Sequence, residues 1–263
     1  MSYSPFYILY IAINIASLTY VLGSLFYGFP IPIYGLKKWG PRMMSDAIYA
    51  GVWVNIYGFI ITFINQIQGL LGIDWNTFYA LLTNLEVQMF DGMTILKSMY
   101  YILTVTRASA AAPILAPILQ FSSFLSDIIF LTQFLIDLGI FIQATYMLLI
   151  SIGILLLSLP FRMGKGIGGT LIASTVIFYV GLPYLPVFVN NIASLLPQVE
   201  LQSLSVTELN YLTETIIGVV PSLIISYIIL PIIYLSILAG LSLGLGNAIG
   251  GSSGKLPFPL DLF

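Results

Sequence analysis

The sequence contains no cysteine and no histidine, and their absence excludes several kinds of chemistry. Without cysteine no disulfide framework forms, and without either residue a thiolate or imidazole metal site is impossible. A serine–histidine pair, a cysteine–histidine pair and a histidine general base are excluded as well. We therefore expect no cofactor, no metal and no enzymatic activity.

Charged residues are also scarce. Eight Lys and Arg and ten Asp and Glu amount to 7% of the chain, whereas a soluble domain carries about a quarter. Hydrophobic residues make up 59%, which leaves too little polar material for a soluble surface. The apolar runs are longer than the ~10-residue alternating segments of a membrane β-barrel. The composition indicates an all-α, polytopic integral membrane protein.

The charges are sorted along the chain, and this sorting predicts the number of crossings. Each crossing needs about 20 residues. If the basic and acidic clusters lie on opposite sides of the membrane, the chain has about seven transmembrane helices. Amphipathic interfacial helices are expected beside them. Residues 1–263 form a single membrane domain in this prediction. The expected spans lie near residues 5–28, 47–73, 89–106, 110–134, 138–159, 167–189 and 215–243. The alternative places residues 89–106 in the membrane interface, which makes the number of spans even and puts one basic cluster on the wrong side. Residues 29–45 are expected to be a loop, residues 74–91 and 190–214 acidic extracytoplasmic loops, and Asp137 a turn.

Most basic residues share one side in this arrangement. The basic loops contain Lys37, Lys38, Arg42, Arg162 and Lys165. The positive-inside rule makes that side cytoplasmic, with the N-terminus outside and the C-terminus inside. The first span lacks a basic n-region and a small-residue cleavage site, so we expect it to be retained. Orientation accounts for these cations without nucleic-acid binding, and Asp46 is an acidic exception on the same side.

Two charges stand apart from this pattern. Asp127 lies inside an apolar run, and Lys97 lies inside the weakest predicted span. An ionisable residue within a membrane is costly and marks a functional candidate. Asp127 is expected to pair with Lys97 or Arg107, to line a polar path, or to be protonated.

Motif-like segments do not support an enzyme. Gly164–Thr170 and Gly250–Lys255 are glycine-rich, but neither fits the phosphate-binding pattern G-x-x-x-x-G-K-[ST]. Gly244-Leu-Gly-Asn247 has Asn where an intramembrane peptidase needs Asp, so a shared-proton carboxylate pair is impossible. The spacing of Gly240 and Gly244 instead allows helices to approach closely, within the chain or between subunits.

The segment from Leu159 to Ala173 has a recognisable order. A span ends in Leu-Pro, a loop with Arg162 and Lys165 follows, and a span with Gly168 and Gly169 ends near prolines. With the long acidic loop and a last proline-kinked span, this order resembles the TrbL-like polytopic subunits of conjugation and type IV secretion machines, and among them the archaeal DNA-import membrane proteins. The similarity covers about the C-terminal two-thirds, and its motifs are apolar.

The resemblance implies a non-enzymatic channel or scaffold subunit in the membrane. Its implied partners are membrane lipids, other copies of itself, a separate hexameric ATPase and small pilin-like membrane proteins, with single-stranded DNA as possible cargo. It also implies that Gly168 and Gly169 pack helices. The residues leave an alternative open, a small-solute permease or transporter subunit. Such a protein would use a polar midplane site, and Asn65, Gln66, Gln68 and Asp127 are its best candidates.

Overall fold

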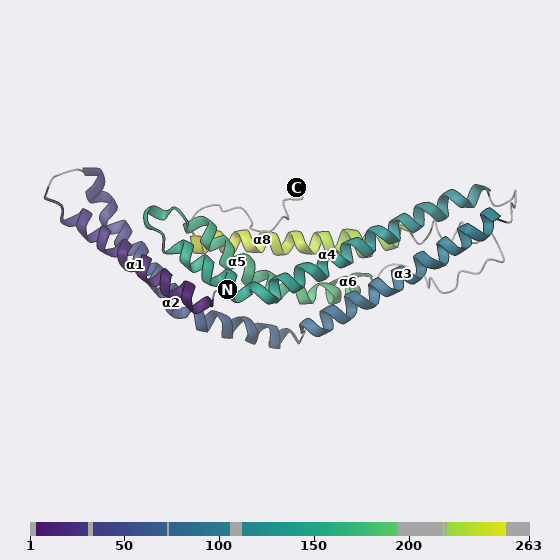
Figure 1. Ribbon diagram of the computed structural model, residues 1–263, viewed down its shortest axis with the longest axis horizontal. Helices are drawn as coiled ribbons and strands as arrows, with labels where there is room; N and C mark the ends of the chain where they lie inside the picture. Colours follow the sequence, from purple (N-terminus) through teal and green to yellow (C-terminus); the bar gives the residue numbers. More distant parts are fainter. Residues whose placement is uncertain are drawn as a thin grey trace. The chain divides into compact units, whose positions relative to one another are not determined.

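The computed structural model describes residues 4–30, 34–72, 74–105, 112–193, 218 and 220–250. The described residues form helices and contain no strand (Figure 1). The chain divides into two compact units. Unit 1 comprises residues 1–72, 141–182 and 236–263, and unit 2 comprises residues 73–140 and 183–235.

The helices are long. In chain order they are α1 (Pro5–Gly28), α2 (Tyr34–Leu71), α3 (Trp75–Val105), α4 (Ala112–Leu157), the 3-10 turn η2 (Pro160–Arg162), α5 (Lys165–Gly181), the 3-10 turn η3 (Leu182–Tyr184), α6 (Leu185–Ala193), the π-helix η5 (Ile225–Ile229) and α8 (Leu230–Gly250). By length and composition, five stretches of the described chain are able to cross a membrane: 5–28, 37–71, 115–157, 165–192 and 220–250. The all-α class and the membrane character agree with the sequence analysis, whereas the predicted seven crossings are not reproduced as separate helices.

Two predicted boundaries differ from the structure. The expected loop at 29–45 is mostly helix, because α2 begins at Tyr34 and continues through Pro41. Pro41 lies inside the helix and removes one backbone donor there, a loss that neighbouring groups can offset by satisfying the freed carbonyl. The segments 74–91 and 89–106 form one helix, α3, which is not among the five apolar stretches.

The predicted turn at Asp137 is absent, and α4 runs without interruption through this position. Asp137 lies on the exposed side of the helix and accepts a hydrogen bond of 3.1 Å from the Gln133 amide. An i, i+4 contact of this kind supports a helix rather than ending it. With 46 residues, α4 is about 69 Å long, more than the ~30 Å that one crossing requires.

In unit 1, α1 and α2 form a hairpin (Figure 1), and the two helices touch at Gly23 and Gly40. A Cβ on Gly23 would lie 2.9 Å from the Gly40 oxygen, and one on Gly40 would lie 2.8 Å from the Gly23 oxygen. Side-chain hydrogen bonds connect the hairpin to other helices of the unit. Thr19 donates to the Ser158 carbonyl at 3.2 Å, and Tyr57 to the Met147 carbonyl at 3.2 Å.

Helix α5 is the most buried helix of unit 1. Its polar side chains, Thr170, Ser174 and Thr175, are buried and donate to backbone carbonyls of their own helix. Because these hydroxyl groups are satisfied locally, α5 is able to lie inside a helix cluster without leaving unpaired donors.

In unit 2, α3 packs along the first part of α4 through a compact apolar core. The core residues recur at intervals of three, four or seven, which places them on one face of each helix. They are Met89 and Leu96 of α3, and Ile118, Phe121, Leu125 and Ile128 of α4. Partly buried residues after position 218, including Val220, Leu223 and Tyr227, pack against the same core.

Helix α3 begins at an aspartate cap. The Asp74 carboxylate accepts a hydrogen bond of 2.7 Å from the Thr77 backbone N–H, as N-cap residues do. Its hydrogen bonds to the side chain and backbone of Thr77 hold the pKa of Asp74 below its ordinary value. In the next turns, Phe78 packs against Gly139 of α4, where a Cβ would lie 2.8 Å from the phenylalanine ring. The cap and this contact fix where α3 starts.

Candidate functional site

A cluster of charges lies at one end of unit 1, between α2 and the α4–α5 connection. The Asp46 carboxylate accepts hydrogen bonds from Arg162, at 2.7 and 3.1 Å, and from the Lys165 ammonium, at 3.1 Å. The Asp46 side chain is 14% exposed, whereas that of Arg162 is 50% exposed. The hydrogen bonds and the charge of Asp46 raise the pKa of Arg162 above its ordinary value. Asp46, the acidic exception on the predicted basic side, is therefore the counter-ion of Arg162 and Lys165.

The loop that carries Arg162 is held in an uncommon conformation. Phe161 and Arg162 have φ angles of 59° and 62°, a left-handed region that side chains with a Cβ seldom occupy. The Phe161 ring packs near Trp39 and Phe26, with ring centroids 6.3 and 6.4 Å apart. The strained backbone persists because the aromatic contacts on one residue and the Asp46 ion pair on the next hold it in place.

The remaining cations of this end are open to solution. Lys37, Lys38 and Arg42 are exposed on the first turns of α2, and no ion pair joins them to any residue in the described part of the chain. Lys165 differs, since its ammonium also lies 5.0 Å from the centre of the Tyr49 ring, a cation–π distance. We call these five cations, together with Asp46, the basic end.

The four glycines predicted to pack helices differ in their surroundings. A Cβ on Gly168 would lie 2.6 Å from the Gly153 oxygen of α4, and one on Gly169 would lie 2.5 Å from the Gly250 nitrogen of α8. Gly240 and Gly244 are exposed, and among the described residues no atom lies within 4 Å of a Cβ on either. Close approach within unit 1 therefore uses Gly168 and Gly169, together with Gly246 and Gly250, and leaves the other pair on an open face.

The structure does not bring together Lys97 and Asp127, one of the two pairs expected from the sequence. Lys97 of α3 and Asp127 of α4 are both exposed in unit 2, and no ion pair joins them. Arg107 lies outside the described residues. The polar set expected for a permease is divided, since Asn65, Gln66 and Gln68 belong to unit 1 and Asp127 to unit 2. Neither unit assembles that set into a site of its own.

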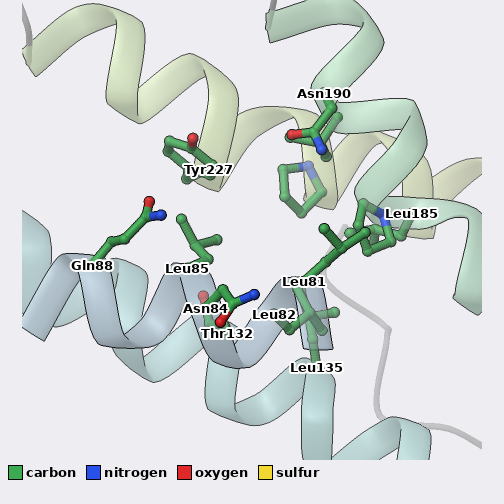
Figure 2. Close-up of a pocket in the computed structure, with 13 residues that line it drawn as sticks. Leu81, Leu82, Asn84, Leu85, Gln88, Thr132, Leu135, Leu185, Asn190 and Tyr227 are labelled. Atoms are coloured by element: carbon green, nitrogen blue, oxygen red, sulfur yellow. The ribbon is translucent and has the colours of Figure 1, made fainter. Parts of the chain in front are cut away.

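Unit 2 contains a cavity that the sequence analysis did not identify. Its volume is about 260 Å³, and α3, α4, α6, η5 and α8 contribute its lining. Leucines and prolines make up most of the wall, and the polar groups are the side chains of Asn84, Gln88, Thr132, Asn190 and Tyr227. Figure 2 shows Asn84, Leu85 and Gln88 on one side of this space, with Asn190 and Tyr227 on other helices. A signal for half of this site exists in the sequence, since Asn84 and Gln88 are four residues apart on one helix face.

Comparison with known proteins shows one relationship over the whole chain. The sequence is 35% identical over 267 residues to the DNA import protein CedA of Sulfolobus acidocaldarius, an alignment that covers 99% of this chain and 99% of that protein. Residues 1–70 also match the family described as DNA import protein CedA1. No solved structure matches the chain.

Proposed function

The chain belongs to the CedA family of DNA import proteins, and on this premise we propose that it is a membrane subunit of a DNA-import apparatus. The single observation that carries the proposal is the 35% identity along nearly the whole of both chains. A match of this extent includes both units rather than one shared segment. The proposed role is that of a channel or scaffold, without enzymatic activity.

The proposed assembly follows the same premise. A separate hexameric ATPase supplies the energy, small pilin-like membrane proteins build the extracellular part, and single-stranded DNA is the cargo. The chain forms a homo-oligomer among membrane lipids, and the open face at Gly240 and Gly244 is available for contact between copies. Genes for such an ATPase and for small two-span membrane proteins are expected beside the gene for this chain.

Removal of the chain tests the proposal. Cells that lack it are expected to show chromosomal marker exchange at the background level of non-exchanging strains, because the import route is incomplete. Expression of the intact chain from a plasmid should restore exchange. Selection for recombinants in mixed cultures of two auxotrophic strains measures the effect. Normal exchange in the deletion strain would contradict the DNA-import role.

A solute permease is the second candidate, and the cavity in unit 2 is the observation that favours it. A compact polar cavity between helices is what such a protein needs. We favour DNA import because family membership rests on the full length of the chain. Normal marker exchange in the deletion strain, with altered uptake of a small uncharged solute, would reverse this order.

We propose that the basic end lies in the cytoplasm, with the N-terminus outside and the C-terminus inside. The chain has no cysteine, so single-cysteine variants report sidedness without background. A membrane-impermeant maleimide should label Asn76→Cys, at the start of α3, in intact cells, and Lys38→Cys only after permeabilisation. Both positions are exposed, so a difference in labelling reports the side of the membrane and not burial of the cysteine. Labelling of Lys38→Cys in intact cells would invert the proposed topology.

A further inference from the structure

The cavity in unit 2 has a lining that excludes charged ligands. No Asp, Glu, Lys or Arg is among the described residues that surround it. A phosphate or carboxylate placed there would lose its hydration without gaining a counter-ion, and burying an unpaired charge is costly. With a volume of about 260 Å³, the cavity is also smaller than the roughly 300–1,000 Å³ of pockets for drug-sized ligands. The occupant is therefore small and uncharged.

Three of the five polar side chains in the lining belong to one chemical type. Asn84, Gln88 and Asn190 each supply a carboxamide, which donates and accepts hydrogen bonds side by side. All three are exposed, and within the described chain no hydrogen bond occupies their side chains. Asn and Gln side chains make paired hydrogen bonds with nucleobase edges, adenine above all. An acyl chain would leave these amides unpaired, at a cost for each.

Tyr227 adds an aromatic ring to the same lining. It lies at an irregular part of the helical backbone. It lies within the π-helix Ile225–Ile229, where the Leu230 N–H donates to the Ile225 carbonyl. Pro231, also in the lining, has no N–H to continue the α-helical pattern. Widened turns of this type occur frequently at functional sites. An aromatic side chain next to hydrogen-bonding groups is the arrangement that holds unstacked bases in single-stranded nucleic acids.

From these features we infer that the cavity of unit 2 receives an unpaired nucleobase of the transported DNA strand. The carboxamides of Asn84, Gln88 and Asn190 hydrogen-bond the base edge, Tyr227 contacts its face, and the charged sugar–phosphate chain stays outside the cavity. This inference rests on the proposed import function. It adds that the chain holds the strand by its bases, in a place where it offers the phosphates no cation.

Binding to two matched strands tests the inference. The full-length chain in lipid nanodiscs is titrated with a fluorescent thymidine–adenosine oligonucleotide and with an abasic strand of equal length, and anisotropy gives each Kd. The wild-type chain should bind the base-containing strand about fivefold or more tightly than the abasic strand, which corresponds to one stacked base. The variant Asn84→Leu/Gln88→Leu/Asn190→Leu should lose that preference, while Gln66→Leu, an exposed amide outside the cavity, keeps it.

The outcomes separate this inference from the proposed function. Equal affinity of the wild-type chain for both strands, or no binding of either, overturns the base site. A preference that survives in the triple variant overturns it as well. Since the substituted amides are exposed, the thermal unfolding midpoint of the triple variant should match that of the wild type. Variants with single substitutions replace it if the midpoint falls. Marker exchange in the deletion strain reports independently on the import function.

Discussion

Replacing Gly169 by alanine is expected to lower the free energy of unfolding of the chain by about 1–3 kcal/mol, the usual cost of overpacking. The added Cβ would lie 2.5 Å from the Gly250 nitrogen, 2.7 Å from its Cα and 2.8 Å from the Gly246 oxygen. These are backbone atoms, so no side chain can rotate away and α5 and α8 must separate. Thermal unfolding in detergent, followed by circular dichroism, measures the change.

Gly240→Ala and Gly244→Ala are the matched controls, because they make the same chemical change on α8. In the part of the chain that the structure describes, no atom lies within 4 Å of a Cβ at either position. Alanine favours a helix over glycine by up to about 1 kcal/mol, so these variants should unfold at the wild-type temperature or above it. Equal destabilisation at all three positions would contradict the helix contact between α5 and α8.

The second large effect is expected from Asp46→Asn, which should destabilise unit 1 by about 1–2 kcal/mol. Removing one partner of a buried ion pair costs about 3–5 kcal/mol, and this value is reduced here because Arg162 is 50% exposed and screened by solvent. The asparagine keeps the shape of the side chain but leaves Arg162 and Lys165 repelling each other beside a neutral group. Urea titration in detergent gives the free-energy difference.

Asp91→Asn is the control, since Asp91 is exposed on α3 and no ion pair joins it to a described residue. Its unfolding free energy should stay within about 0.5 kcal/mol of the wild type. Arg162→Gln combined with Asp46→Asn completes a double-mutant cycle, which isolates the energy of the pair. If the two single effects simply add, the ion pair contributes nothing and the loop conformation rests on the Phe161 contacts alone.

The candidate sites illustrate what local pattern can and cannot predict. The basic clusters of α2 and of the α4–α5 connection are visible in the sequence, because charges stand out against an apolar background. The role of Asp46 as their shared counter-ion is not visible, since it joins residues that are 116 and 119 positions apart. The cavity likewise combines side chains from distant helices, so no single segment has a composition that marks it.

The helix boundaries show the same division. The apolar run predicts α1 at its observed bounds, Pro5–Gly28. The run has the length of one membrane crossing, begins at a proline and ends at a glycine, so it leaves no choice of where the helix starts and stops. The sequence analysis divides the region of α4 at Asp137, because an odd number of crossings is needed between the acidic loop before this region and the basic loop after it, and one crossing is too short for so many apolar residues. In the structure the helix continues through this position. Gln133 hydrogen-bonds the Asp137 carboxylate, and the nearby Gly139 packs against Phe78 of α3.

By itself the sequence determined the class of this protein. Scarce charge and long apolar runs indicate a membrane protein built from helices. In a membrane each backbone N–H and C=O must be hydrogen-bonded within the protein, and a helix achieves this within one segment. It also determined the family, since identity to a relative is a property of the residues alone. Only the tertiary structure decided which glycines carry helix contacts, which acid neutralises the basic end and which amides share a cavity. Each of these depends on the distance between segments far apart in the chain, and the packing of side chains sets that distance.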